Sequence, residues 1–125
     1  MGSNHTIRKI ASTGLVTTLA GSPGIWGSAD GAGGDAKFDY PFGIAAGPSG
    51  NIYVADWGNA MIRKITSTGV VTTIAGIKGF RGSTDGTNVD AKFGYPWGIA
   101  VDSTEHILYV TDIYKNMIRK ITLTP

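Results

Sequence analysis

The sequence predicts an all-β protein built from repeated sheets of four short antiparallel strands. Three observations support this prediction: an internal duplication, closely spaced turn signals, and runs of β-branched residues without a helical pattern. Residues 7–45 align with residues 62–100 at an offset of 55 without a gap, which marks a duplication. After Ile99 the offset becomes 56, because the turn around Ser103–His106 is one residue longer than the matching turn around Pro48.

Four strands are expected in each copy, called A to D from the inside outwards. Strand A, residues 43–46, follows Pro41 and is rich in small residues, as suits a crowded innermost strand. A Gly-Pro-Ser-Gly turn separates it from strand B, residues 51–56. Strands C and D follow at residues 61–66 and 70–75. Each connection is a tight turn, so the four strands are expected to be antiparallel neighbours.

The apolar residues of these strands do not alternate strictly with polar ones. Ile52, Tyr53 and Val54 are consecutive, as are Val70 and Val71. Both faces of each sheet must therefore be covered. Four short strands with both faces packed against neighbouring sheets describe a β-propeller blade. The segments between strands carry too many glycines for helices.

The strand count predicts assembly. From residue 7 the chain runs C, D, A, B, C, D, A, B, C, which is about two blades with strand C duplicated. A closed propeller needs about four to eight blades, so we expect ring closure by oligomerisation, as a six-bladed homotrimer or alternatively an eight-bladed homotetramer. Strand D from residues 13–18 of one chain would complete residues 107–121 of the next. We expect residues 118–121 to stay in place and the residues before Ala11 to be displaced.

The repeat divides the chain into three parts. Residues 1–5 are expected to be tag-like or disordered. Residues 6–61 form the first repeat, and residues 62–125 form the second repeat plus a final strand C.

Four motifs in this order resemble the NHL repeat of six-bladed propellers. They are P-x-G-I-A, N-I-Y-V-A-D, N-x-M-I-R-K-I and V-V-T-T-I-A-G, running from Pro41 to Gly76. The Gly- and Asp-rich connector before them resembles that of many bacterial members. Lys115 replaces the motif asparagine found at Asn4 and Asn59, and Thr111 replaces Ala55. The resemblance implies a propeller; some similar proteins are lyases or hydrolases that use channel-facing histidines and carboxylates, and others bind RNA through a basic face.

Composition argues against several classes of function. The formal charge of +2 is too small to indicate a polyanionic partner, and no apolar run approaches a membrane span. No signal peptide is evident, so a cytoplasmic location is the default, and Asn4-His5-Thr6 is interpreted as a chance match to a glycosylation acceptor. With no cysteine and only His5 and His106, no catalytic or cofactor site is expected.

Four connector carboxylates are weak candidates for calcium ligands: Asp30, Asp35, Asp85 and Asp90. Oxygen ligands on a flexible loop can hold calcium. The spacing matches no EF-hand, and Asp before Gly commonly forms turns, so turn bonding is the preferred interpretation.

Arginines recur on strand C at Arg63 and Arg119. They could form a basic RNA-binding face, but Asp56 and Asp112 lie close enough in the blade to neutralise them. We expect these two aspartates to hold the register of the blade by hydrogen bonds, and nucleic acid is not the expected partner.

Aromatic residues recur at the entrance to strand A. Phe42 and Trp97 could line a pocket for a peptide or carbohydrate near the channel mouth. Phe38 and Phe93, in the matching connectors, are expected to be buried between blades. The sequence thus favours a non-catalytic propeller scaffold that self-assembles, with a protein- or RNA-recognition module and a remnant of an NHL-type enzyme as alternatives.

Overall fold

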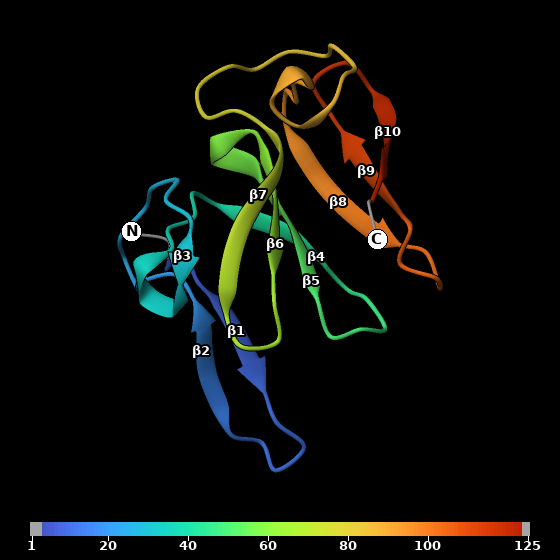
Figure 1. Cartoon of the computed structure of the whole chain (residues 1–125). Coiled ribbons are helices and arrows are strands. Elements are labelled where there is room, and N and C mark those ends of the chain that lie inside the picture. The colour runs from blue at the N-terminus through green and yellow to red at the C-terminus, as the bar shows by residue number, and fades with distance from the viewer. Residues whose placement is uncertain (1–3, 124–125) are drawn as a thin grey trace.

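The structure, a computed structural model, describes residues 4–123 except the side chain of Val89. Three antiparallel sheets follow one another across the molecule (Figure 1). The N-terminal hairpin comprises β1 (Ile7–Ile10) and β2 (Val16–Ala20). The central blade comprises β3 (Gly31–Ala32), β4 (Pro41–Ala46), β5 (Ile52–Asp56), β6 (Met61–Ile65) and β7 (Val70–Gly76). The C-terminal sheet comprises β8 (Pro96–Val101), β9 (Ile107–Asp112) and β10 (Met117–Thr122).

The predicted class and strand order are confirmed. The N-terminal hairpin supplies strands C and D, the central blade supplies A to D as β4 to β7, and the C-terminal sheet supplies A to C. The helical segments among the described residues are 3-10 turns of three residues, at Gly33–Asp35, Trp57–Asn59 and Asn88–Asp90. None of the described helices has the length and apolar character needed to cross a bilayer.

Strand β3 is an element that the sequence did not predict. Its two residues pair with Val70 and Val71 at the outer edge of β7. The connector between the hairpin and the central blade therefore extends the sheet to five strands.

The two repeats also share the register of their strand pairs. In the N-terminal hairpin Ile7 pairs with Ala20, and in the central blade Ile62 pairs with Ala75. Both ladders shift register immediately after that isoleucine. The two hairpins therefore share the same strand geometry, including the irregularity.

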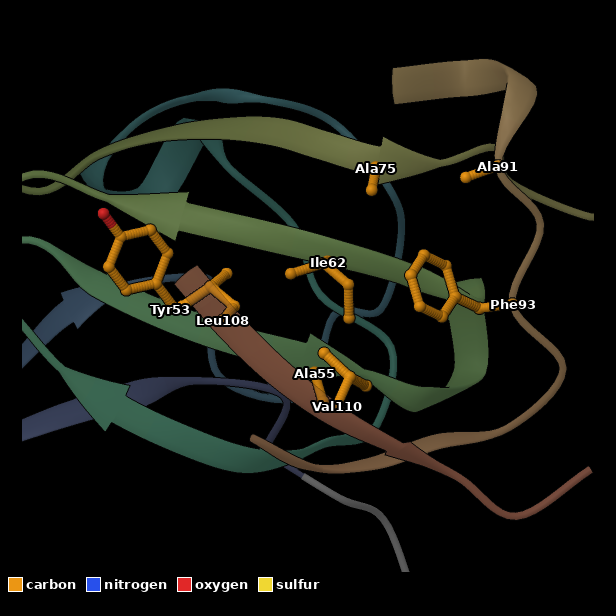
Figure 2. Close-up of a cluster of buried hydrophobic side chains, with 8 residues drawn as sticks. All are labelled: Tyr53, Ala55, Ile62, Ala75, Ala91, Phe93, Leu108 and Val110. Carbon is orange, nitrogen blue, oxygen red and sulfur yellow. The ribbon is translucent and has the colours of Figure 1, made fainter. Parts of the chain in front are cut away.

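Two apolar cores lie between successive sheets. The first joins the central blade to the C-terminal sheet, as Figure 2 shows, and consists of Tyr53, Ala55, Ile62, Ala75, Ala91, Phe93, Leu108 and Val110. The second joins the N-terminal hairpin to the central blade and consists of Ile7, Ala20, Ala36, Phe38, Val54, Ile65 and Val71. The central blade is thus covered on both faces, as its non-alternating strands require.

The inner strands of neighbouring sheets approach closely. A Cβ atom at Gly43 of β4 would lie 2.3 Å from the carbonyl oxygen of Trp97 in β8. Only glycine allows this approach of two backbones, which explains the small residues of the innermost strand.

The N-terminal segment belongs to the fold from Asn4 onwards, so the expectation of a tag-like or disordered segment at residues 1–5 is wrong for its last two residues; residues 1–3 lie outside the described part. His5 is buried, and its Nδ1 accepts a hydrogen bond from the Tyr40 amide at 3.0 Å. His5, Ala60 and Asn116 occupy the same place in successive repeats, with left-handed φ values of 54°, 57° and 57°. The segment is the end of a repeated turn between strands B and C.

Candidate functional site

A buried ion-pair network ties strands B and C to the connector. Asp56 ends β5, and Arg63 lies beside it on β6. Arg63 Nη1 donates to Asp56 Oδ2 at 2.8 Å, and both side chains are fully buried. Arg63 Nη2 donates to Asp30 Oδ1 of the connector at 2.9 Å. Asn59 Nδ2 and the Asp39 amide donate to the Asp56 carboxylate at 2.7 and 2.9 Å.

The surroundings of Asp56 change the pKa of its carboxyl in two opposite ways. Burial raises its pKa, while the hydrogen bonds from Asn59, the Asp39 amide and Arg63 oppose that rise. The network thus holds the buried guanidinium of Arg63 beside this buried carboxyl.

The C-terminal sheet repeats the network. Arg119 contacts Asp112 at 3.4 Å and Asp85 at 2.9 Å, and it donates to the Lys92 carbonyl at 2.9 Å. The Gly94 and Tyr95 amides also donate to Asp112, each at 2.9 Å. The structure therefore places Asp56 and Asp112 in structural positions that fix the blade.

Arg63 and Arg119 do not form a binding surface. Their exposed fractions are 0% and 6%, and their guanidinium groups lie 4.9 Å from the ring centres of the buried Phe38 and Phe93. Their assignment as binding residues is corrected, because the connector covers the strand C arginines. A basic RNA-binding face cannot be built from these two side chains.

The connector carboxylates bind protein groups. Asp30 accepts from Arg63 and from the Thr73 hydroxyl at 2.8 Å, and Asp85 accepts from Arg119. Asp35 and Asp90 are exposed in 3-10 turns. Within residues 4–123 no three His, Cys, Asp or Glu side chains gather in a way that could hold a metal. The strongest acidic contacts are therefore ion pairs with arginine.

An aromatic row follows the ends of the inner strands. We define it as Tyr40, Phe42, Trp57, Tyr95, Trp97 and Tyr114. Phe42 of β4 stacks on Trp97 of β8, with ring centres 4.3 Å apart and planes 16° apart. These two rings are 49% and 45% exposed. The structure thus brings together the two aromatic residues that the sequence singled out for binding.

Trp57 connects the aromatic row to the blade ends. Its ring meets Phe42 edge-on at 5.8 Å and Tyr95 at 5.3 Å. Arg81 lies over Tyr95 at 4.3 Å and donates to the Trp57 carbonyl at 3.2 Å. The centre of the aromatic row is therefore fixed by packing, while Phe42 and Trp97 keep faces open to solvent.

Glu105 makes a contact between blades that was not expected from the sequence. It lies in the turn between β8 and β9 and reaches the preceding blade, where it accepts from the Ser49 amide at 2.9 Å, the Asn51 amide group at 3.0 Å and the Tyr53 hydroxyl at 2.8 Å. These bonds, those from Ser49 first, lower the pKa of Glu105 to about 2. Burial, with Glu105 as a second cause, raises the pKa of Tyr53 to about 12.

Glu105 clamps the central blade to the C-terminal sheet. Its φ of 58° places it in the left-handed region, where the matching turn residue of the first repeat is Gly50. The signal available in the sequence was the one-residue insertion in this turn.

Comparison with known proteins identifies the repeat. The family model of the NHL repeat matches residues 38–65. Human NHL repeat-containing protein 2 is 30% identical over 100 residues, covering 78% of this chain and 14% of that protein. The chain therefore spans only a small part of this curated relative.

Solved structures share the fold. A Bacteroides thetaiotaomicron protein of unknown function superposes with a TM-score of 0.85 at 28% identity, covering 95% of this chain and 30% of that one. An auxiliary nutrient binding protein of the same organism gives a TM-score of 0.77 at 25% identity, with coverages of 94% and 32%. A streptogramin B lyase gives 0.58 at 17% identity, covering 96% and 34%, and shows the fold alone. The matched family model marks an NHL repeat within the chain, and the structural likenesses support a β-propeller fragment built from such repeats.

Proposed function

We propose that the 125-residue chain is a non-catalytic propeller scaffold whose copies join head to tail into a closed ring, a homotrimer with six blades. An eight-bladed homotetramer is the alternative. The observation that carries the proposal is a difference in burial between equivalent residues. Side chains that are buried in the central blade are exposed at both ends of the chain.

Because the sequence is repeated, the exposure of equivalent side chains can be compared within one chain. Ile118 of β10 is 70% exposed, whereas its equivalent Ile62 in β6 is 0% exposed. Val16 of β2 is 44% exposed, whereas its equivalent Val71 in β7 is 1% exposed. Apolar surface of this kind favours association, because burying it releases water from both partners.

The two ends of the chain present different surfaces. Ile62 packs in one cluster with Phe93 and Val110 of the following sheet. By the repeat, Ile118 would take the place of Ile7 against Phe38 and Val54 of a second copy, two side chains that Ile7 covers in the single chain. A contact between unlike surfaces is heterologous, and it closes into a ring when the rotation per chain divides a full turn.

The number of copies follows from the family resemblance. The repeat resembles that of six-bladed propellers, and the chain supplies about two blades. Three copies are therefore the expected number.

Two blocked variants test the head-to-tail joint. Ile118→Lys places a charge on the C-terminal surface and Val16→Lys places one on the N-terminal surface; both sites are exposed, so the chain should still fold. Each variant alone is expected to be monomeric by native mass spectrometry. An equimolar mixture should give a heterodimer and no ring, because one intact surface of each kind remains.

Val70→Lys is the matched control. Val70 is 40% exposed on the central blade, and this variant should assemble like the unmodified chain. Homodimers of either blocked variant would show that the contact joins like surfaces, and the head-to-tail proposal would fail.

The non-catalytic part of the proposal rests on the two histidines. His5 is buried and its Nδ1 accepts from a backbone amide. His106 lies in a hairpin turn, where its Nδ1 is 2.9 Å from the Thr104 hydroxyl. His5 lies 4.0 Å from the Asp39 carboxylate but is buried, whereas the exposed His106 contacts a hydroxyl. Neither therefore combines an open position with a carboxylate partner, as a general base requires.

Ligand recognition at the aromatic row is the second candidate function. The exposed stacked pair Phe42 and Trp97 favours it, because flat aromatic faces bind the apolar faces of sugars and peptide side chains. A titration of tryptophan fluorescence with a panel of oligosaccharides and peptides tests it. The change in fluorescence should disappear in Phe42→Ala; a response that survives in this variant would place the ligand elsewhere.

A further inference from the structure

We propose that the joint between two copies is closed by strand exchange: β2 of one copy pairs with the free edge of β10 of the other, and β1 leaves its place beside β2. This inference rests on the ring proposed above and names the strand that completes it. Its partner is a second copy of the chain.

The free edge of β10 borders a groove of about 540 Å³. One side of the groove is Met117–Thr122, and the other includes Ile74, Ala75, Ala91 and Phe93. In the central blade the equivalent space beside β6 is occupied by β7, whose Val71 is buried in the same cluster as Ala36 and Phe38. The groove therefore corresponds to the place of a strand D.

Strand β2 matches that place in sequence and register. Residues 16–20 read V-T-T-L-A, and residues 71–75 of β7 read V-T-T-I-A. Paired with β10 as β7 is with β6, β2 would bring Val16 into the groove. The edge strand β10 would then form backbone hydrogen bonds with β2, as in other cases of strand addition.

Two identical strands compete for one place in this joint. Residues 7–10 and 118–121 both read I-R-K-I, so β10 can remake with β2 the pairs that β1 makes now. The strand that stays is the one with more contacts of its own. Strand β10 pairs at six positions with β9, whereas β1 pairs at four positions with β2.

The side chains also favour β10. Arg119 is buried and bound to Asp112, Asp85 and two carbonyls, whereas its equivalent Arg8 is exposed. Met117 occupies the position of Met61, which is buried in the central blade, whereas β1 offers Thr6 there. Retaining β10 therefore keeps the arginine network and places a methionine where β1 has a threonine.

Engineered cysteine pairs test this assignment, because the chain has no cysteine of its own. Lys9 pairs with Thr17 in the N-terminal hairpin, as Lys64 pairs with Thr72 in the central blade. Strand exchange would instead place Lys120 of one copy opposite Thr17 of the next. In Figure 1 β2 and β10 lie at opposite ends of the molecule, so a link between residues 17 and 120 must join two copies.

The double variant K120C/T17C should form covalent dimers and trimers on oxidation. The double variant K9C/T17C should lose the ring when oxidised, since the disulfide holds β1 against β2, and regain it on reduction. The pair K64C/T72C is the matched control: it should link within one chain and leave assembly unchanged, because it has the same register inside the complete blade.

The outcomes separate the two proposals. A ring that persists in oxidised K9C/T17C would show that β1 holds the joint. Links between copies in K9C/Y109C would show the same, because Lys9 would then face Tyr109 as Lys120 does in the single chain. Either result would overturn strand exchange while leaving the proposed ring intact. Failure of K120C/T17C to link, while K64C/T72C links, would overturn it too. If the reduced proteins are monomers of 13.1 kDa, the proposed ring itself fails.

Discussion

Arg63 depends on acceptors from three separate segments of the chain. Its guanidinium is completely buried and bonds to the Asp56 carboxylate, to Asp30 and to the carbonyls of Lys37 and Ala29. Its Nε has no hydrogen-bond partner among the described residues. Loss of the Asp56 carboxylate would therefore leave the buried guanidinium with the half-exposed Asp30 as its remaining counter-charge among the described residues.

Replacing Asp56 by Asn should lower the free energy of unfolding by about 3 to 5 kcal/mol, the usual cost of removing one partner of a buried ion pair. Urea unfolding at a fixed protein concentration measures this. Asp35→Asn is the control, since Asp35 is exposed. Equal unfolding midpoints for Asp56→Asn and the unmodified chain would show that the network does not stabilise the blade.

Glu105 should make stability depend on acid. Its folded pKa of about 2 lies below the ordinary value of 4.5, so its stabilising effect is complete above pH 4.5 and is lost as the pH falls towards 2. The difference in unfolding free energy between the unmodified chain and Glu105→Gln should shrink over this range. Glu105 is the single glutamate of the chain, so carboxyl NMR can follow its titration; a midpoint near 4.5 would contradict the clamp.

Each connector behaves as a structural element of its blade, although it has little regular structure. It places a fully buried phenylalanine between two sheets, Phe38 in the first repeat and Phe93 in the second. It also supplies carbonyl acceptors to the strand C arginine and, in the first repeat, adds β3 to the sheet. The glycine-rich segment is therefore part of the core.

Phe93→Ala should cost about 3 to 5 kcal/mol, because it leaves a cavity in the core of Figure 2 and removes the ring beneath Arg119. Phe42→Ala removes a half-exposed ring and should cost much less. Chemical denaturation of both variants at one protein concentration checks this. Similar losses for the two variants would mean that the connector is not a core element.

The sequence predicted strands A to D because their signals are local: turn residues and β-branched runs. It also placed the aspartates beside the arginines, because strand neighbours follow from the hairpin order. The burial of Arg63 was not predictable in this way, since it depends on a connector folding over β6. The Glu105 clamp and β3 are also contacts between segments far apart in sequence.

One paired exchange of residues distinguishes the two repeats. In the first repeat Gly58 faces Asp39, and in the second Gly94 faces Tyr114; a Cβ on either glycine would lie 2.5 Å or less from the facing side chain. Gly94 replaces Asp39 and Tyr114 replaces Gly58 in the repeat. The exchange of large and small residues is therefore compensated in space, which a comparison of single positions does not show.

The molecule as a whole presents one complete blade between two incomplete ones. The N-terminal hairpin has strands C and D, and the C-terminal sheet has strands A to C. Equivalent residues that are buried in the central blade are exposed on both flanking sheets. In the proposed ring, the two ends of the 125-residue chain are parts of one blade that a second copy completes.

Native mass spectrometry of the unmodified 125-residue chain measures how many copies the proposed ring contains. For a closed six-bladed ring of three 13.1 kDa chains, we expect a single species of about 39 kDa. Its mass should stay the same when the protein is diluted or concentrated. A species of 13.1 kDa at all concentrations, or an open series of growing oligomers, would contradict closure of the ring.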